Sequence, residues 1–521
     1  MATQQERVEL HKTIWKIAND LRGSVDGWEF KAYVLGAIFY RYISENITNY
    51  LNRLQHQSGD TDFDYAELKD EEAEEAREMV VEEKGYFILP SQLFCNVVKE
   101  CKAGKIDKLN ERLSNIFLAI EESALGQPSE QDLKGLFSDF TVESSSLGKT
   151  VSKRNELLSK VLTSVNTMNL AEDIEDNSID AFGDAYEFLM QMYAANAGKS
   201  GGEFFTPQAV SELLAMIASY NNPNIRSVYD PCCGSGSLLL KFAKTVGKKN
   251  PNLMYYGQEI NPSTYNLCRI NMFLHGINFS NFDIALGDTL KYPQHRDLEP
   301  FDAIVSNPPY SIAWAGEDDT VLAGDDRFTP AGVLAPKSKA DLAFTMHMLK
   351  SLSETGTASI VEFPGVLYRG GAEQKIRKYL IYNNYVDTVI QLPANLFFGV
   401  GIATCIIVLK KSAKRDNCVL FIDASNMFKK EGNKNYLLNE HQDRILELYA
   451  RREDVQYLSR LVKNDDILDN DCNLTVSSYV EQEDNREVIN ITEVNAKLRD
   501  LASKGNELNQ KIDAIIKELG E

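Results

Sequence analysis

Phe301-Asp-Ala-Ile-Val-Ser-Asn-Pro-Pro-Tyr310 is the stretch of sequence that decides how the rest of the chain is interpreted. Its first half predicts a short buried strand, because Ala303, Ile304 and Val305 are consecutive apolar residues. The two prolines that follow cannot continue a central strand, so Asn307 is expected at the strand's carboxyl end. Open α/β sheets bind their ligands at that edge.

The tetrapeptide Asn307-Pro308-Pro309-Tyr310 suits the methylation of a planar, conjugated NH2 group, whose delocalised lone pair makes it a poor nucleophile. The side-chain oxygen of Asn307 and the carbonyl oxygen of Pro308 can each accept one N–H and aim the lone pair at a methyl donor. Tyr310 would stack on the ring that carries the amine. A methylsulfonium donor is already activated, so positioning and electrostatics would supply the rate without acid, base or metal. A plain proline turn is the alternative interpretation.

Composition and charge set limits on the kind of protein. With 43% hydrophobic and 25% charged residues, the 521-residue chain fits a globular protein of about two to four domains. It has no apolar run of roughly 18 residues and no signal peptide, so we expect a cytoplasmic protein without a membrane segment. The eight scattered cysteines predict free thiols and no zinc site. A net charge of −21 argues against binding nucleic acid by bulk charge, so a partner would have to supply part of the grip on DNA.

The first 170 residues carry apolar side chains at helical spacing and no catalytic constellation, which predicts a helical interaction domain. Between residues 60 and 83 there are twelve acidic residues, and we expect a solvated helix face or hairpin there. The expected helices span about 6–21, 26–43, 91–102, 105–122, 130–137 and, further on, 178–195. A glycine-rich loop then ends in Thr206-Pro207, where Thr206 as N-cap and Pro207 at the first helical position predict a helix from Gln208. A plain interdomain hinge is the alternative for that loop.

From residue 226 strands alternate with helices, and three successive expected strands end in Asp230, Glu259 and Asp288. Gly234-Ser235-Gly236-Ser237 follows the first strand and lets a ligand approach the backbone closely, without the third glycine of a dinucleotide fingerprint. Glu259 lies near the spacing at which an acid accepts from ribose hydroxyls, and Asp288 would accept from an adenine amine. Each acid alone is alternatively a helix cap.

The alternation continues to residue 409 and predicts a doubly wound, mostly parallel α/β sheet with a late hairpin. Two segments stand apart from it. Residues 311–339 form a long stretch rich in Gly, Asp and Pro, which we predict to be a mobile loop until a target base is bound. Residues 491–519 carry apolar residues in alternating steps of three and four, which predicts a heptad helix for a partner or, alternatively, a docked amphipathic helix.

In this order the motifs resemble those of gamma-order N6-adenine DNA methyltransferases: Gly-Glu-Phe-Phe-Thr-Pro, Asp-Pro-x-x-Gly-Ser-Gly, Gly-Gln-Glu, Gly-Asp and Asn-Pro-Pro-Tyr. With its helical N-terminal region and terminal helix, the whole chain resembles the modification subunit of a Type I restriction–modification system. The resemblance implies a Rossmann-like, S-adenosylmethionine-dependent methyltransferase sheet at residues 171–475. It also implies an all-helical domain at 1–170 and a C-terminal helical tail for subunit assembly at 476–521.

The resemblance also implies roles for individual residues. The flipped adenine would be held by Asn307, Pro308, Pro309 and Tyr310, with Phe397 or Phe398 as a second stacking wall. S-adenosylmethionine would be surrounded by Glu203, Phe204, Phe205, Thr206, Pro207, Gln208, Asp230, Gly234, Ser235, Gly236, Ser237, Glu259 and Asp288. Cys232 and Cys233 stand where family members commonly have two alanines, and we interpret them as small apolar replacements rather than nucleophiles.

The implied partners are double-stranded DNA, a separate specificity subunit that chooses the target sequence, and a restriction–motor subunit in the full complex. Two copies of this chain would flank one specificity subunit. Other interpretations stay open: a methyltransferase of protein glutamine or of an RNA base, a stand-alone adenine DNA methyltransferase, and a catalytically silent scaffold. The length of the helical region and the heptad tail favour the Type I subunit.

Overall fold

The computed structural model describes residues 12, 14, 27–168, 206–247, 250–397, 401–412, 414, 416–432, 434–482 and 491–520. The helix expected over 178–195, nearly all of the one over 6–21, Glu203 to Phe205 and Phe398 lie outside the described residues. The chain divides into two compact units, Met1–Val480 and Glu481–Glu521. Each unit is described by itself.

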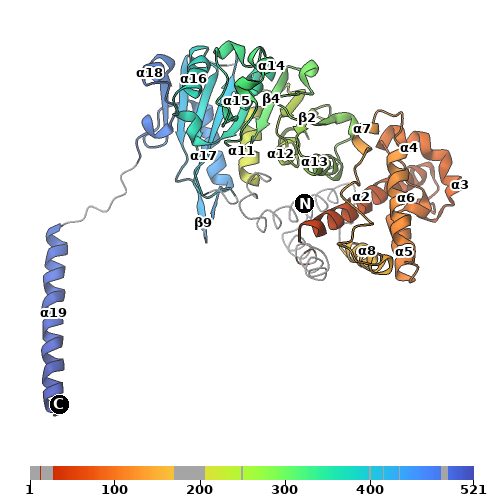
Figure 1. Cartoon of the computed structure of the whole chain (residues 1–521), viewed down its shortest axis with the longest axis horizontal. Coiled ribbons are helices and arrows are strands. Elements are labelled where there is room, and N and C mark those ends of the chain that lie inside the picture. Colours follow the sequence, from red (N-terminus) through yellow and green to blue (C-terminus); the bar gives the residue numbers. More distant parts are fainter. Residues whose placement is uncertain are drawn as a thin grey trace. The chain divides into compact units, whose positions relative to one another are not determined.

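The N-terminal part of the first unit is helical, as the apolar spacing predicts (Figure 1). Its helices are α2 Gly27–Ser58, α3 Asp70–Ala73, α4 Arg77–Lys84, α5 Phe94–Lys102, α6 Leu109–Glu122, α7 Glu130–Leu133 and α8 Val151–Val165. Buried aromatic rings join them: Phe117 stacks on Phe137 at 4.2 Å between centroids, and Tyr40 meets Phe94 edge-on at 5.5 Å. The helix expected over 130–137 ends early, because Gly135 adopts a positive φ of 67° that stops it.

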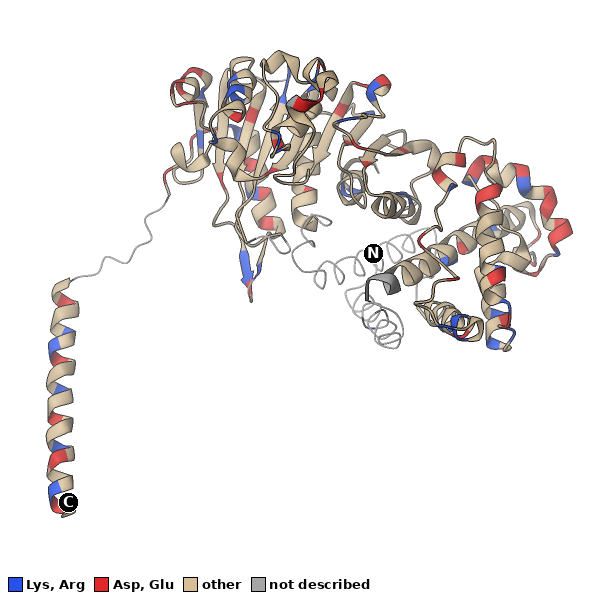
Figure 2. Ribbon diagram, in the orientation of Figure 1, with Lys and Arg blue, Asp and Glu red and all other residues tan. Residues whose placement is uncertain are grey.

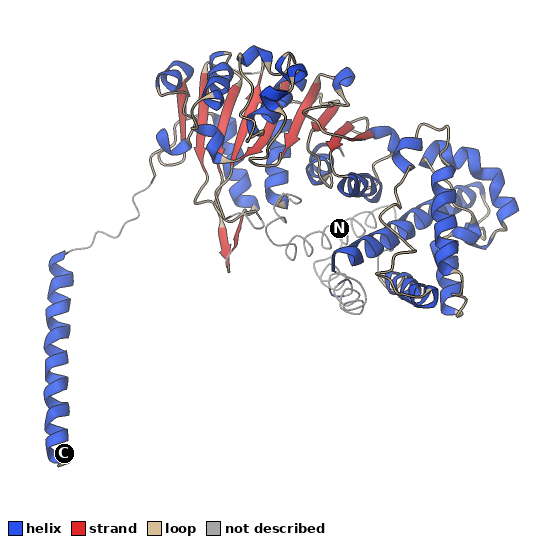
Figure 3. Ribbon diagram, viewed as in Figure 1, coloured by secondary structure: helices blue, strands red, loops and turns tan. Residues whose placement is uncertain are grey.

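The second part is a nine-stranded sheet in the order β11-β8-β6-β7-β5-β4-β1-β2-β3 (Figure 3). The strands are β1 Ser227–Asp230, β2 Met254–Glu259, β3 Phe282–Leu286, β4 Phe301–Ser306, β5 Leu352–Glu362, β6 Val386–Gln391, β7 Cys405–Lys410, β8 Cys418–Asp423 and β11 Ser459–Lys463. β3, β2, β1, β4 and β5 are parallel, and β7 pairs antiparallel with both β5 and β6. The mostly parallel sheet with a late hairpin is therefore confirmed.

Helices cover both faces of the sheet, and each face has its own core. One face packs against α11 Gln208–Ser219, α12 Ser237–Val246, α13 Pro262–Leu274 and α17 Asn439–Arg451. The other packs against α14 Thr320–Ala323, α15 Asp341–Ser351, α16 Ala372–Tyr382 and α18 Asn464–Asp469. β4 shows why: Ala303 and Val305 enter the first core and Ile304 enters the second, as the two-residue period of a strand requires.

The helical part packs against the sheet part through α13. Arg269 is buried there, and its Nη1 donates to the carbonyl oxygens of Gln131 at 2.8 Å, Asp132 at 3.2 Å and Lys134 at 3.0 Å. Phe273, on the same helix, lies 6.1 Å from the Phe39 ring. These contacts make one continuous core out of the helical part and the first face of the sheet.

Residues 311–339 are partly packed, and their mobility in the absence of a bound base stays a prediction. They contain α14 and two short turns of 3-10 helix, Gly316–Asp318 and Thr329–Ala331. Leu322, Phe328 and Leu334 are buried in the second core. The sequence shows no helical pattern here, because the three apolar side chains lie six residues apart rather than three or four.

The described residues of the second unit, 481–482 and 491–520, contain one helix, α19 Ile491–Glu518, of 28 residues. None of its residues is buried, and its large apolar side chains expose between 43% and 72% of their surface. They are Ile491, Val494, Leu498, Leu501, Leu508, Ile512, Ile515 and Ile516, and Leu519 just beyond the helix exposes 76%. The helix expected from the heptad spacing is confirmed. None of the described helices has the length and apolar content needed to cross a bilayer.

Candidate active site

The carboxyl ends of β1, β2 and β4 lie at one edge of the sheet, because these strands run parallel in adjacent positions. That edge therefore brings together Asp230 at the end of β1, Glu259 at the end of β2 and Asn307 just after β4. β3 ends at Leu286, so Asp288 lies two residues beyond its strand. The expected convergence of these side chains is thus what the topology produces.

The turn after β1 depends on two glycines. Gly234 and Gly236 have positive φ angles of 55° and 82°, a conformation that other residues rarely adopt. A Cβ on Gly236 would lie 2.8 Å from the Cys268 sulfur, whereas a Cβ on Gly234 would meet no atom within 4 Å. The turn is therefore packed tightly against α13 at Gly236 and faces open space at Gly234.

Glu259 holds this turn from the neighbouring strand. Its Oε2 accepts the N–H of Gly234 at 3.0 Å, and its Oε1 accepts the N–H of Asn261 at 2.8 Å. Burial raises the pKa of Glu259, although hydrogen bonds from the backbone oppose that shift. Each carboxylate oxygen has two lone pairs, so one acceptor position on each remains available for a ligand hydroxyl.

Asp230 is completely buried, and its hydrogen bonds are made to other residues of the chain. Its Oδ1 accepts the N–H of Cys232 at 3.0 Å and the hydroxyl of Ser306 at 2.8 Å. Burial raises the pKa of Asp230 to about 7. Ser306 directly precedes Asn307, so this carboxyl fixes the glycine turn to the end of β4.

Asp288 caps the turn that follows it. Its Oδ1 accepts the backbone N–H groups of Leu290 at 3.0 Å and Lys291 at 3.2 Å. The carboxylate is only partly buried. Asp288 therefore acts as a cap, which was the alternative interpretation for each acid. Its second carboxylate oxygen stays available to a ligand.

Asn307 is held between two side chains from different parts of the chain. Its Nδ2 donates to the hydroxyl of Thr206 at 3.0 Å, and its Oδ1 accepts from the hydroxyl of Tyr310 at 2.6 Å. Because Thr206 takes the amide nitrogen, the amide oxygen is the atom that points toward Tyr310. The Tyr310 ring lies 6.4 Å from the ring of Phe363 at a tilt of 44°.

The role predicted for Thr206 as a helix cap is wrong. α11 does begin at Gln208, but Pro207 occupies the cap position and no side-chain hydrogen bond caps the helix. The hydroxyl of Thr206 is used by Asn307 instead. The sequence could not show this bond, because it joins residues that are 101 positions apart.

The remaining expected side chains are less exposed than their roles would suggest. Phe397 exposes only 4% of its surface, so its ring is packed in the first core. Burial raises the pKa of the Cys232 thiol, and a hydrogen bond with Cys268 together with burial raises that of Cys233. Both thiols therefore stay protonated at neutral pH, in keeping with small apolar replacements.

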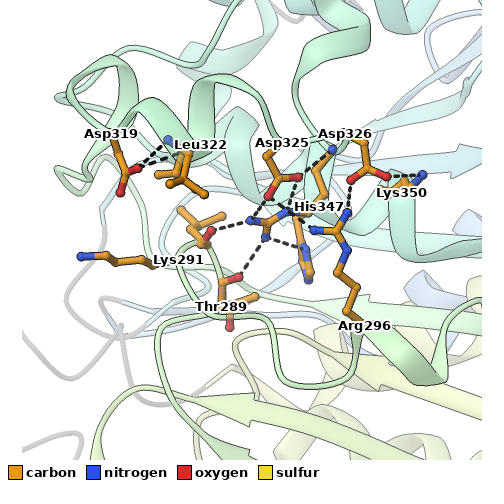
Figure 4. A network of polar contacts seen from close by, with 12 residues as sticks. Thr289, Lys291, Arg296, Asp319, Leu322, Asp325, Asp326, His347 and Lys350 are labelled. Atoms are coloured by element: carbon orange, nitrogen blue, oxygen red, sulfur yellow. Dashed lines mark hydrogen bonds and ion pairs between the residues drawn. The ribbon is translucent and has the colours of Figure 1, made fainter.

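A buried polar network contacts β1 and the turn that follows β3 at this edge of the sheet (Figure 4). The sequence did not predict it. Arg327, 2% exposed, donates to the carbonyl oxygens of Thr289 at 3.0 Å and Leu290 at 2.6 Å and pairs with Asp325 at 2.8 Å. It also donates to Nδ1 of His347 at 3.2 Å. The network joins residues 311–339 to the turn that Asp288 caps.

His347 continues this network to β1. Burial, with Arg327 next, lowers the pKa of His347 to about 3, so the ring is neutral. Since an arginine can only donate, Nδ1 is the acceptor and Nε2 carries the proton. Nε2 then donates to the hydroxyl of Tyr229 at 3.1 Å. Tyr229 directly precedes Asp230, so the network reaches both the first and the third of the acid-bearing turns.

Two family models match the chain. A model described as N-6 DNA Methylase matches residues 177–488, and one described as HsdM N-terminal domain matches residues 10–165. The methylase subunit of the Type I restriction enzyme MpnII from Mycoplasma pneumoniae is 48% identical over 99% of this chain and 97% of its own length. That of the enzyme HindI from Haemophilus influenzae is 31% identical over 61% of this chain and 66% of its own length.

Solved structures agree with these relatives. The methyltransferase subunit of a Type I restriction–modification system from Streptococcus thermophilus is 35% identical, with a TM-score of 0.81. The match covers 91% of this chain and 100% of that one. The similarity therefore extends through both the helical part and the sheet.

Proposed function

Because this chain belongs to the family of Type I restriction–modification methylase subunits, we propose that it transfers a methyl group from S-adenosylmethionine to N6 of a flipped adenine in double-stranded DNA. The observation that carries the proposal is Asn307, whose amide is oriented by Thr206 at the carboxyl edge beside the glycine turn. An amide fixed in this way offers an acceptor to an exocyclic amine.

The residues at the edge fit S-adenosylmethionine. The glycine turn faces open space at Gly234, and the oxygens of Glu259 and Asp288 retain acceptor positions for ribose hydroxyls and for an adenine amine. Glu203 to Gln208, Ser235 and Ser237 complete the proposed set around the cofactor. When bound, S-adenosylmethionine supplies a methyl group that is already activated on a sulfonium.

At the target base, the chain's own side chains provide positioning. An amine N–H would replace the Tyr310 hydroxyl at Oδ1 of Asn307, while Thr206 keeps the amide from rotating. The carbonyl oxygen of Pro308 would accept the second N–H. The ring of Tyr310 would stack on the base, with Phe397 or Phe398 as a second wall after a local rearrangement.

Assembly is the second part of the proposal. Residues 171–475 would form the catalytic domain, residues 1–170 a helical interaction domain and residues 476–521 the assembly tail. An isolated amphipathic helix is marginal in water, so the exposed apolar stripe of α19 needs a partner helix. We assign that helix to a specificity subunit, with two copies of this chain per specificity subunit. A restriction subunit would join in the full complex, which would act in the cytoplasm.

The catalytic proposal is tested with this chain copurified with its specificity subunit. Unmodified DNA and labelled S-adenosylmethionine should give N6-methyladenine at a defined sequence. Structured RNA and glutamine-containing protein are the alternative substrates. Transfer to either of these and none to DNA would refute the proposal, and no cofactor binding by calorimetry would favour the silent scaffold.

The assembly proposal is tested by truncation before Val488, which should keep cofactor binding and lose complex formation and DNA methylation together. Leu498→Glu with Ile512→Glu should have the same effect. Ser503→Glu with Gln510→Glu is the matched control, because these residues lie on the polar side of the same helix. A normal complex from the truncated chain in gel filtration would rule out α19 as the assembly helix.

A further inference from the structure

A small antiparallel hairpin stands apart from the nine-stranded sheet. It consists of β9 Lys429–Glu431 and β10 Lys434–Tyr436, paired in the register Lys434 to Glu431 and Tyr436 to Lys429. The residues of β9 are exposed, and Tyr436 exposes 45% of its surface. We refer to residues 429–432 and 434–436 as the lysine hairpin.

The lysine hairpin lies at the same edge of the sheet as Asn307. It follows β8, which runs parallel to β6, and β6 is parallel to β5 because both pair antiparallel with β7. Since β5 is parallel to β4, the carboxyl ends of β4 and β8 point the same way. The hairpin thus extends from the edge that carries the candidate site (Figure 1).

Two sets of contacts fix the base of the hairpin. On one side, Asn435 donates its N–H to the carbonyl of Asn395 at 3.2 Å and its Nδ2 to the carbonyl of Ala394 at 2.8 Å. These two residues begin the turn that leads to Phe397. The hairpin is therefore attached to the wall proposed for the target base.

On the other side the chain enters α17 directly after the hairpin. Leu437 is buried in the first core, and Gln442 donates its Nε2 to the carbonyl of Ala209 at 2.7 Å. Ala209 lies in the first turn of α11, three positions after Thr206. The base of the hairpin is thus held close to the residue that orients Asn307.

The hairpin differs in charge from the chain as a whole. It contains three lysines and one glutamate, whereas the whole chain has a net charge of −21. Lys429 pairs with Glu431 at 2.7 Å. Lys430 is exposed and has no acidic partner among the residues that the structure describes. Figure 2 shows the Lys and Arg colour concentrated on this hairpin.

We propose that the lysine hairpin contacts the phosphate backbone of the duplex that carries the target adenine. The inference rests on the proposed function, which makes DNA the substrate. An acidic protein repels phosphate, so a positive projection beside the site would offset that repulsion where the duplex has to lie. Ammonium groups bind phosphates irrespective of sequence, so the hairpin would orient the duplex over Asn307 and read no bases.

The test replaces the three lysines together, as Lys429→Gln, Lys430→Gln and Lys434→Gln, in the complex with the specificity subunit. Loss of three phosphate contacts should weaken DNA binding about a hundredfold or more near 0.1 M salt and reduce the slope of log affinity against log salt by about two to three. Calorimetric affinity for S-adenosylmethionine should not change. Replacing the same residues by arginine keeps the charge and should keep DNA affinity.

Lys102→Gln, Lys105→Gln and Lys108→Gln together form the matched control, because these three lysines are exposed and lie in the helical part. The control should bind DNA as the wild type does. An equal loss in the control, or an unchanged affinity and salt slope in the hairpin variant, would overturn the inference. Loss of subunit assembly would overturn it too, by making the hairpin a protein contact. A wild-type complex that neither binds nor methylates DNA would instead refute the proposed function.

Discussion

The two halves of the candidate site hold their side chains by different means. On the side of the glycine turn, the buried Asp230 and the half-buried Glu259 accept N–H groups from the backbone, and desolvation raises the pKa of both carboxyls. On the other side, Asn307 is uncharged and is held by the hydroxyls of Thr206 and Tyr310. The first half therefore relies on ionisable carboxyl groups, and the second relies on hydrogen bonds between uncharged groups.

This difference assigns separate tasks to the two halves. Carboxylates suit hydroxyl and amine groups that must be bound tightly, since hydrogen bonds to charged acceptors are the stronger ones. A neutral amide suits an amine that must remain nucleophilic while it is held. We therefore expect changes in the first half to alter cofactor affinity and changes in the second half to alter the rate of transfer.

The largest effect is expected from Asn307→Ala. It removes the only side-chain acceptor proposed for the target amine and should lower kcat by about a thousandfold or more. Affinity for S-adenosylmethionine in calorimetry should stay at the wild-type value, because Asn307 does not touch the glycine turn. Transfer within about tenfold of the wild-type rate would show that the amide is not the group that holds the amine.

Glu259→Ala is the complementary change in the first half. Two ribose hydroxyls would lose a charged acceptor, so the dissociation constant for the cofactor should rise about a hundredfold. At saturating cofactor, kcat should recover most of its value. Glu259→Gln retains one acceptor oxygen, so its dissociation constant for the cofactor should lie between those of the wild type and Glu259→Ala. If calorimetry gives the same affinity for Glu259→Ala and wild type, the residue only holds the glycine turn.

Tyr310 tests the second half through stacking. Tyr310→Ala should weaken capture of the base by about 1–3 kcal/mol, measured as DNA affinity or as fluorescence of a 2-aminopurine at the target position. Tyr310→Phe keeps the ring and should be milder. An equal loss of base capture in both variants would show that the hydroxyl, which donates to Oδ1 of Asn307, matters more than stacking of the ring.

Thr206 sharpens the comparison, because its motif is assigned to the cofactor while its hydroxyl serves Asn307. Thr206→Val keeps the shape and removes the acceptor, which should lower kcat about five- to tenfold by freeing the amide to rotate. Thr206→Ser should remain close to wild type. A fall in cofactor affinity with an unchanged kcat would show that Thr206 acts in cofactor binding and not in holding Asn307.

The smallest effect on turnover is expected from Asp230→Asn, which reports on stability. The pKa of Asp230 is raised to about 7, so between its unfolded value near 3.9 and 7 the folded protein holds a proton that the unfolded chain has lost. The free energy of unfolding should therefore decrease as pH rises through that window, by a few kcal/mol at most. The decrease should be smaller in Asp230→Asn when denaturation is followed at pH 5 and pH 8.

Asp132 provides the control for that measurement. Burial raises its pKa to about 7 as well, so Asp132→Asn should reduce the same pH dependence from a position in the helical part. If neither substitution changes the pH dependence, both carboxyls are ionised in the folded protein. Asp230 would then carry a full negative charge in the folded protein throughout this pH window.

Sequence alone was sufficient for the strands and acids of the first half. Apolar runs such as residues 303–305 and the acids that follow strands are local patterns, and the parallel order brings their ends together. Strand β8 contains a similar apolar run, Val419 to Ile422, so the sequence could also have predicted this strand. What could not be predicted were contacts between distant residues. The bond from Thr206 to Asn307 and the burial of Arg327 depend on the assembled fold.

Arg327 has a consequence for the order in which the chain folds. Its partners lie on a turn 38 residues earlier and on a helix 20 residues later, and the same network joins Tyr229 to His347 across 118 residues. Contacts of such sequence separation carry a large loop-closure cost and form after local ones. We expect β1, the turn after β3 and α15 to be in place before residues 311–339 dock. During synthesis the strand that delivers Asn307 would thus be complete well before the segment that follows Tyr310 reaches its final position.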